Sequence, residues 1–274
     1  EDTCVPPEHL PDYIVEFRAL LDSHGLSYGM FGHVDAGVLH VRPALDMYDP
    51  QQEVLMKQIS DDVVALTAKY GGLLWGEHGK GFRAEYSPAF FGETLYAELR
   101  KIKAVFDPDN RLNPGKICPP EGIDAPMKKV DAAKRGTWDR QIPIAVRSSW
   151  RGAMECNGNG LCFNFDVKSP MCPSMKVSNQ RIHSPKGRAT LVREWLRLLA
   201  DRGVDPNQLE KALPEQGVSL RSLVARTRNS WHARKGEYDF SHEVKEAMSG
   251  CLACKACSTQ CPIKIDVPEF RSRF

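Results

Sequence analysis

Seven of the nine cysteines in this 274-residue chain fall into two groups whose spacing could bind iron. The second group runs from Cys251 to Cys261 with the spacing C-x2-C-x2-C-x3-C and is followed by Pro262. Three thiolates at x2 spacing converge on one 4Fe–4S cluster, and the fourth thiolate of such a run ligates a second cluster. The pattern predicts that electrons pass through this protein.

The first cluster needs a fourth thiolate from outside the run. Cys172 precedes a proline, as Cys261 does, and is therefore the expected mirror of that residue. By this logic Cys251, Cys254 and Cys257 hold one cluster, with Cys172 as the remote ligand.

A second cluster would depend on a less regular group of residues. Cys156 and Cys162 keep the outer positions of a C-x2-C-x2-C run, but the middle position is Asn159. With Cys261 they offer three thiolates, which could hold a three-iron cluster or a labile cube. The alternative is a single cluster with Cys156 and Cys162 unused. We therefore expect one or two iron–sulfur clusters, at least one of the 4Fe–4S type.

Disulfides and a zinc ribbon are the alternative uses of clustered cysteines. A chain of this length needs no disulfide staples, and a zinc ribbon requires two C-x2-C pairs, whereas here three cysteines share one run. Cys4 and Cys118 have no partner at ligand spacing, and we interpret them as structural thiols.

A second set of potential ligands comes from two glycine-containing stretches. His33 and His40 are seven positions apart, so they cannot share one face of a regular strand, in which side chains alternate. A turn at 35–37 would bring both imidazoles to one point, where Glu77 could add a carboxylate. Two histidines and one carboxylate form a common catalytic metal site with an open position, which would leave His78 as a base. On spacing alone, histidines buried in the core would explain the pattern equally well.

In the first 118 residues, predicted helices alternate with predicted strands, and these elements must position the candidate ligands. Apolar residues recur at helical spacing in three segments: 10–21, 55–70 and 95–106, the last stopped by Asp107-Pro108. Apolar stretches with glycine lie between them and read as strands: 28–34, 38–41 and 71–75. This order predicts an α+β fold in which helices cover one face of a sheet.

The remainder of the chain divides into two segments. Four prolines interrupt residues 119–150, which read as a linker whose scattered basic residues form a solvated face. From Trp150 onward the chain reads as helical, with apolar stripes at 191–199 and 240–248. We therefore expect a first domain over residues 1–118, a linker over 119–150 and a mainly α-helical iron–sulfur domain over 151–274.

Composition excludes several classes of protein. Hydrophobic residues make up 42% and charged residues 26%, as in ordinary globular proteins. The net charge of +2 does not indicate a nucleic-acid partner. No apolar run reaches the roughly 18 residues that span a bilayer, and no secretory signal is present. We expect a cytoplasmic location, with attachment to the inner face of a membrane through a partner as the alternative.

The stretches 1–3, 32–40, 76–79 and 106–116 together resemble the C-terminal domain of FAD-linked oxidases, the family of D-lactate and D-2-hydroxyglutarate dehydrogenases. The resemblance covers residues 1–118. The continuation through both cysteine groups is similar to the large bacterial members that fuse flavin and ferredoxin parts. The fold implied is α+β with an antiparallel sheet and helices, followed by a mainly α-helical ferredoxin-type domain.

The resemblance also implies roles for particular residues. In members that oxidise 2-hydroxy acids, two histidines and a glutamate hold a divalent metal, often zinc, which implies His33, His40 and Glu77 as ligands. His78 matches the histidine that accepts the proton of the substrate hydroxyl. Asn113, in the Asn-Pro-Gly-Lys run, matches a position near the flavin.

The implied activity is oxidation of a small D-2-hydroxy acid, D-2-hydroxyglutarate or D-lactate, to the 2-oxo acid. The metal would act as a Lewis acid, a hydride would pass from the α-carbon to FAD, and the iron–sulfur centres would carry electrons to an external acceptor. Val38 stands where many relatives carry an asparagine, which leaves the substrate open. The chain has no G-x-G-x-x-G loop. FAD is expected mainly on a domain N-terminal to Glu1, so we expect the isolated chain to be inactive.

Two other functions stay open. One is an iron–sulfur electron-transfer module whose metal site is degenerate, and the other is a structural zinc protein. Only a dehydrogenase would lose turnover on mutation of His78, and only a zinc protein would lack visible absorption.

Overall fold

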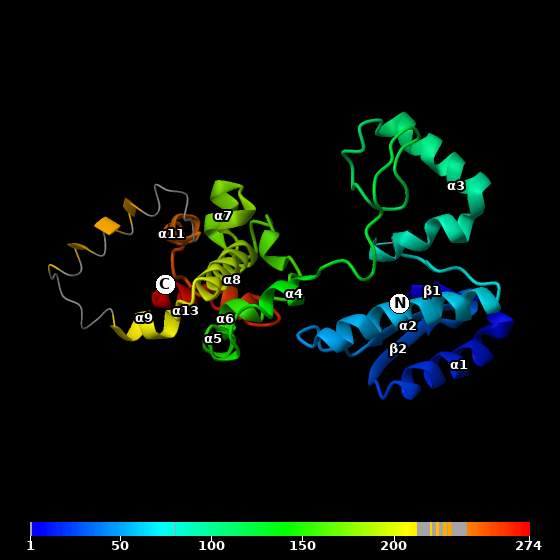
Figure 1. Ribbon diagram of the computed structural model, residues 1–274, viewed down its shortest axis with the longest axis horizontal. Helices are drawn as coiled ribbons and strands as arrows, with labels where there is room; N and C mark the ends of the chain where they lie inside the picture. Colours follow the sequence, from blue (N-terminus) through cyan, green and yellow to red (C-terminus); the bar gives the residue numbers. More distant parts are fainter. Residues whose placement is uncertain are drawn as a thin grey trace. The chain divides into compact units, whose positions relative to one another are not determined.

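The computed structural model describes residues 2–79, 81–212 and 240–274, together with isolated positions between 220 and 231. Glu1, which belongs to one of the matched stretches, lies outside the described residues. The chain divides into two compact units, Glu1–Thr137 and Trp138–Phe274 (Figure 1).

The first unit is built on a three-stranded antiparallel sheet with the strand order β1-β3-β2. The strands are β1 Asp2–Cys4, β2 Tyr28–His33 and β3 Val38–Pro43. A 3₁₀ turn, Val34–Ala36, closes the β2–β3 hairpin, and β1 pairs with the other edge of β3, with Asp2 opposite His40. The strands predicted at 28–34 and 38–41 and the turn between them are confirmed.

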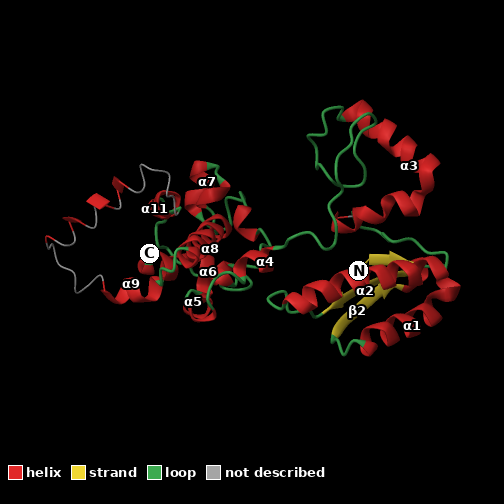
Figure 2. Cartoon of the chain, viewed as in Figure 1, coloured by secondary structure: helices red, strands yellow, loops and turns green. Residues whose placement is uncertain are grey.

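Two helices, α1 Leu10–Ser23 and α2 Pro50–Lys69, cover one face of this sheet (Figures 1 and 2). A 3₁₀ helix, Pro7–His9, leads into α1. Helix α2 begins after Asp49, whose carboxylate accepts the Gln51 N–H at 2.8 Å. The buried side chains between the helices and the sheet are Val5, Leu10, Tyr13, Phe17, Leu21, Leu39, Val41, Ile59, Val63 and Leu66. The core therefore uses one face of the sheet, and side chains of the opposite face point away from α1 and α2.

Helix α3, Ser87–Phe106, follows a 3₁₀ helix at Gly81–Tyr86. It is kinked at Gly92, whose φ of 68° and ψ of 170° lie in a region that glycine tolerates best. The carboxylate of Asp107 accepts the N–H groups of Arg111 and Leu112, each at 2.8 Å, which fixes the turn after the helix. The predicted stop at Asp107 is confirmed.

The strand predicted at 71–75 is wrong. Within this stretch Leu73 alone pairs, through an isolated bridge in which Leu73 and Cys4 exchange hydrogen bonds of 2.7 and 2.9 Å. Gly71 has a φ of 64°, and a Cβ on Gly72 would lie 2.4 Å from the Cys4 carbonyl oxygen. The chain therefore turns closely past β1 here, because glycine permits both the conformation and the approach.

The second unit consists of helices and loops in its described residues. Its α-helices, the first of which begins just before the unit boundary, are α4 Arg135–Asp139, α5 Ile144–Ser149, α6 Arg151–Met154, α7 Pro173–Ser178, α8 Pro185–Asp201, α9 Pro206–Ala212, α11 Ser241–Ser249, α12 Ala256–Gln260 and α13 Val267–Arg273. Short 3₁₀ helices lie at Leu161–Phe163 and Arg181–His183.

Helix α8 forms the centre of this unit and packs on α6, α11 and α13. It begins at Pro185, and the hydroxyl of the preceding Ser184 caps it by accepting the Gly187 N–H at 3.0 Å. The large buried side chains around it include Trp150, Met171, Met175, Trp195, Leu196, Met248 and Phe270. Six thiols join the same core: Cys156, Cys162, Cys172 and Cys257 lie within it, and Cys251 and Cys261 pack at its edge.

The predicted fold class, α+β followed by a mainly helical part, is confirmed. The apolar stripes predicted at 191–199 and 240–248 lie on α8 and α11, although Phe240 itself precedes α11. The domain boundaries at 118 and 150 stay a prediction; α5 lies inside the segment 119–150, and Ile142, Val146 and Trp150 belong to the second core. Among the described residues, no helix combines the length and the apolar character that a membrane crossing requires.

Candidate metal centre and cysteine cavities

The β2–β3 hairpin brings the two histidines of the first unit to one face of the sheet. In its antiparallel register His33 lies opposite Val38, and His40 lies opposite Phe31. Side chains at these pairs share a face, the one that points away from α1 and α2. The turn depends on Gly37, which has a φ of 66° and would place a Cβ 1.8 Å from the Val5 carbonyl oxygen.

Glu77 is positioned by contacts between its loop and the first strand. The Gly76 N–H donates to the Asp2 carbonyl oxygen at 3.1 Å, and the His78 N–H donates to Asp2 Oδ2 at 2.9 Å. Arg83 donates to the Leu74 carbonyl oxygen at 2.9 Å. Asp2 is 7% exposed, so its backbone carbonyl and its carboxylate act as buried acceptors that fix the backbone on either side of Glu77.

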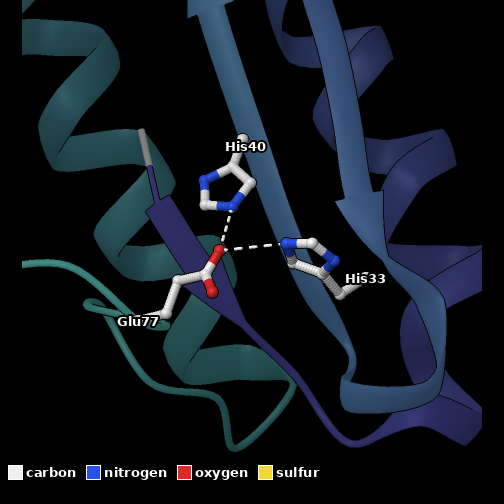
Figure 3. Close-up of side chains that lie close together, drawn as sticks. All are labelled: His33, His40 and Glu77. Atoms are coloured by element: carbon white, nitrogen blue, oxygen red, sulfur yellow. Dashed lines mark hydrogen bonds and ion pairs between the residues drawn. The ribbon is translucent and has the colours of Figure 1, made fainter.

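The three side chains converge on one point (Figure 3). Glu77 Oε1 lies 2.5 Å from His40 Nε2 and 3.2 Å from His33 Nε2. One ligand atom from each residue lies within 4.8 Å of the other two, as a shared metal ion requires. The side chains of His33 and Glu77 are 54% and 38% exposed, whereas that of His40 is 11% exposed, so the donor set opens to solvent on one side.

His40 also has a carboxylate on its far side. Its Nδ1 lies 3.6 Å from Asp2 Oδ1, while Nε2 faces Glu77. Histidine ligands of metals generally have such a carboxylate or carbonyl partner for the second ring nitrogen, which fixes the tautomer and the ring orientation. At 3.6 Å the contact of Asp2 with His40 is an ion pair and not a hydrogen bond, and the sequence analysis missed it because a short first strand gives no spacing signal.

The other two predicted residues of this unit lie in different surroundings. The ring of His78 is exposed and lies 5.2 Å from that of His40, with Nε2 3.9 Å from Glu77 Oε1. Asn113 lies in an exposed turn after α3 with a φ of 48°, and its carbonyl accepts the Lys116 N–H at 3.2 Å. Asn113 is not among the residues that contact His33, His40 or Glu77 in the distances given above.

In the second unit, four cysteines line a common cavity. Cys172, at the start of α7, meets Cys251, Cys254 and Cys257 there. These are the four thiols that the sequence assigns to one cluster. Arg188 from α8 also lines this cavity.

A neighbouring cavity is lined by the other three thiols. Cys156, Cys162 and Cys261 line it together with Asn159. Pro185, at the start of α8, contributes to the walls of both cavities. The seven cysteines therefore line two cavities in sets of four and three, and in each cavity thiols of one sequence group meet thiols of the other, as in the ferredoxin ligation pattern.

The loops 156–162 and 251–257 have the same backbone pattern. In the first, Gly158 and Gly160 have φ values of 75° and 80°; in the second, Ala253 and Lys255 have 54° and 59°. Each positive φ therefore falls two or four residues after the first cysteine of its loop. Non-glycine residues rarely adopt such values, so the backbone at Ala253 and Lys255 is held in a conformation that the two glycines of the first loop adopt without strain. The match places Asn159 at the position that Cys254 occupies in the second loop.

All nine cysteines are free thiols. Burial raises the pKa of Cys162 and of Cys257, so without a bound cation these side chains favour the neutral thiol. Cys118 is buried, and its pKa is also raised by burial, while the Cys4 thiol donates to the Ala36 carbonyl oxygen at 3.1 Å.

Residues 1–117 match the family of FAD linked oxidases, C-terminal domain, and residues 152–265 match the 4Fe-4S dicluster domain. The D-2-hydroxyglutarate dehydrogenases of Escherichia coli (strain K12) and Pantoea ananatis are 89% and 80% identical over all 274 residues, which is 27% of each of those proteins. A D-lactate dehydrogenase of Archaeoglobus fulgidus is 31% identical over 42% of this chain and 26% of its own length. The chain spans about a quarter of these curated relatives. The chain therefore combines a segment that matches the C-terminal domain of FAD-linked oxidases with a segment that matches the 4Fe-4S dicluster domain.

Proposed function

We propose that this chain supplies the metal site and the iron–sulfur relay of an FAD-dependent dehydrogenase that oxidises D-2-hydroxyglutarate to the 2-oxo acid. The observation that carries the proposal is the convergence of His33, His40 and Glu77 on an open face of the sheet. The names of the relatives at 80–89% identity over the whole chain support this substrate over D-lactate, because the D-lactate dehydrogenases of Anaerostipes hadrus and Archaeoglobus fulgidus match 43% and 42% of the chain.

Two imidazole nitrogens and one carboxylate oxygen suit a divalent cation such as zinc, with a position left for substrate. A cation held by His33, His40 and Glu77 would supply Lewis-acid polarisation of the hydroxyl, FAD would supply a hydride acceptor, and clusters held by the cysteines would supply one-electron transfer. The chain's own residues orient these events. Asp2 holds the ring of His40, and the exposed imidazole of His78 accepts the hydroxyl proton, a task for which imidazole is suited near neutral pH.

We assign two clusters to the second unit. The cavity of Cys172, Cys251, Cys254 and Cys257 offers four thiolates to a 4Fe–4S cluster. The neighbouring cavity, with Asn159 at the fourth position of its loop, offers three thiolates to a second cluster. Anaerobically purified protein should then contain roughly seven to eight irons per chain with matching sulfide, whereas about four would restrict the assignment to the first cavity.

The flavin is held mainly by a separate domain in this proposal, with Asn113 near it. In support, the curated relatives are about four times as long as this chain. In the same proposal, an external molecule accepts the electrons.

The experiment is substitution of Glu77 by Gln and of His78 by Gln in the FAD-loaded holoprotein. Glu77→Gln should remove the bound divalent metal, measured by elemental analysis, and reduce turnover of D-2-hydroxyglutarate. His78→Gln should keep the metal and reduce turnover by about 100-fold or more, because a positioned general base contributes at least that much. Both variants should keep wild-type iron and sulfide.

His9→Gln is the matched control, because His9 is exposed and contacts Tyr70 away from the cluster. It should behave as wild type. Full turnover in His78→Gln would favour the alternative, an electron-transfer module with a degenerate metal site. Zinc without iron in the wild-type protein would contradict both.

A further inference from the structure

Arg188 is an unusual side chain in the second unit because it is charged and 1% exposed. Its Nε donates to the Ala247 carbonyl oxygen at 2.7 Å, and Nη2 donates to Ser174 Oγ at 2.8 Å. Its Nη1 lies 3.7 Å from the sulfur of Cys172, to which it donates. The guanidinium is therefore held by three partners: Ala247 on α11, Ser174 on α7 and Cys172 in the wall of the first cavity.

None of the ion pairs within the described part of the chain includes Arg188. By contrast Arg193, one and a half turns further along α8, is 7% exposed and forms an ion pair with Asp139. A buried cation is costly unless an opposite charge faces it. The partners of Arg188 are a carbonyl, a hydroxyl and a thiol, so the compensating charge must come from the cavity that it lines.

We propose that Arg188 raises the reduction potential of the cluster in the cavity of Cys172, Cys251, Cys254 and Cys257. This inference rests on the proposed iron–sulfur function of that cavity. One electron enters on reduction, from reduced FAD in turnover or from dithionite in the test, and no covalent bond forms or breaks. The added negative charge is stabilised by a buried guanidinium, and an N–H donated to a ligand sulfur acts in the same direction.

The test is a redox titration of the anaerobically purified holoprotein with dithionite, followed by electron paramagnetic resonance. Arg188→Met removes the charge and keeps much of the side-chain length, and it should shift the midpoint potential of one cluster to a more negative value. Arg188→Lys keeps the charge but not the planar fork, and it should give a smaller shift in the same direction. Arg197→Met is the matched control, because Arg197 lies on the same helix and pairs with Glu194; it should leave the potential unchanged.

An unchanged potential in Arg188→Met, with wild-type iron and sulfide, would overturn the inference. If that variant fails to hold iron, Arg188→Lys decides: a lower potential than wild type supports the role, and an equal or higher one refutes it. A wild-type protein that shows no reducible 4Fe–4S signal would instead contradict the proposed function of the cavity. The two failures are therefore distinguishable.

Discussion

The side chain of Asn159 determines how many ligands the second cavity can offer to a cluster. Its Oδ1 accepts the Leu161 N–H at 2.9 Å, and its Nδ2 donates to Asn157 Oδ1 at 2.8 Å, so the side chain is bonded within its own loop. Asn159 and its counterpart Cys254 are both exposed, whereas Cys156 and Cys162 are buried. A four-iron cluster in this cavity would have one iron without a cysteine thiolate, because Cys156, Cys162 and Cys261 supply only three.

Asn159→Cys is therefore expected to complete the ligand set. The variant should hold close to eight irons per chain and show a four-iron signal in place of any three-iron signal, measured by iron analysis and electron paramagnetic resonance. Asn157→Cys adds a thiol two residues away, outside the ligand position, and should not produce the change. An identical spectrum in wild type and Asn159→Cys would show that the loop match does not extend to ligation.

The sequence was sufficient to nominate the candidate ligands, but not the residues that contact those ligands from other segments of the chain. His33, His40 and Glu77 were nominated by residue type and resemblance, and they lie together in the structure. Asp2 and Arg188 were missed, because their roles depend on contacts between segments far apart in the chain. No periodicity or ligand spacing records such contacts.

Among the elements, the β2–β3 turn controls the distance between the two histidines. Gly37→Ala would force a Cβ against the Val5 carbonyl oxygen at a positive φ, so it should destabilise the first unit by about 1–3 kcal/mol. The bound divalent metal should decrease with it. Denaturant unfolding and elemental analysis measure both effects.

Gly29→Ala tests whether this loss is specific to the turn. Gly29 lies in β2 of the same hairpin, and a Cβ there would meet no heavy atom within 4 Å. This variant should retain its metal and most of its stability. Equal metal loss in both variants would mean that the turn has no special part in positioning His33 and His40.

The difference between local sequence patterns and long-range contacts also explains which helices and strands could be predicted. Helices α1, α2 and α8 carry apolar periodicity along one local stretch, so the sequence identifies them. Strand β1 has three residues and depends on pairing with β3, and the 71–75 stretch turns because of Gly71, so neither follows from local apolar content. The shared loop pattern was hidden as well, since Ala253 and Lys255 are not residues that indicate positive φ.

At the scale of the whole molecule, the two compact units should respond to different treatments. Chelation of the divalent metal should increase amide hydrogen exchange in peptides covering 28–43 and 74–79. Oxidative destruction of the clusters should increase it in peptides covering 156–172 and 251–261. Mass spectrometry of the holoprotein measures both, and a response of both units to either treatment would contradict separate sites.

The residues that line the two cavities determine when each cavity can form during protein synthesis. Each cavity combines thiols from before α8 with thiols from after α11, and Pro185 belongs to both. During translation, at roughly 5–20 residues per second, Cys156, Cys162 and Cys172 leave the ribosome several seconds before the chain reaches Cys261. During this interval Cys156, Cys162 and Cys172 are present as free thiols, and the later cysteines that line the same cavities have not yet been translated. Neither cavity has its full set of thiols until the late loop has emerged, so the proposed clusters would assemble only after Cys251–Cys261 has been translated.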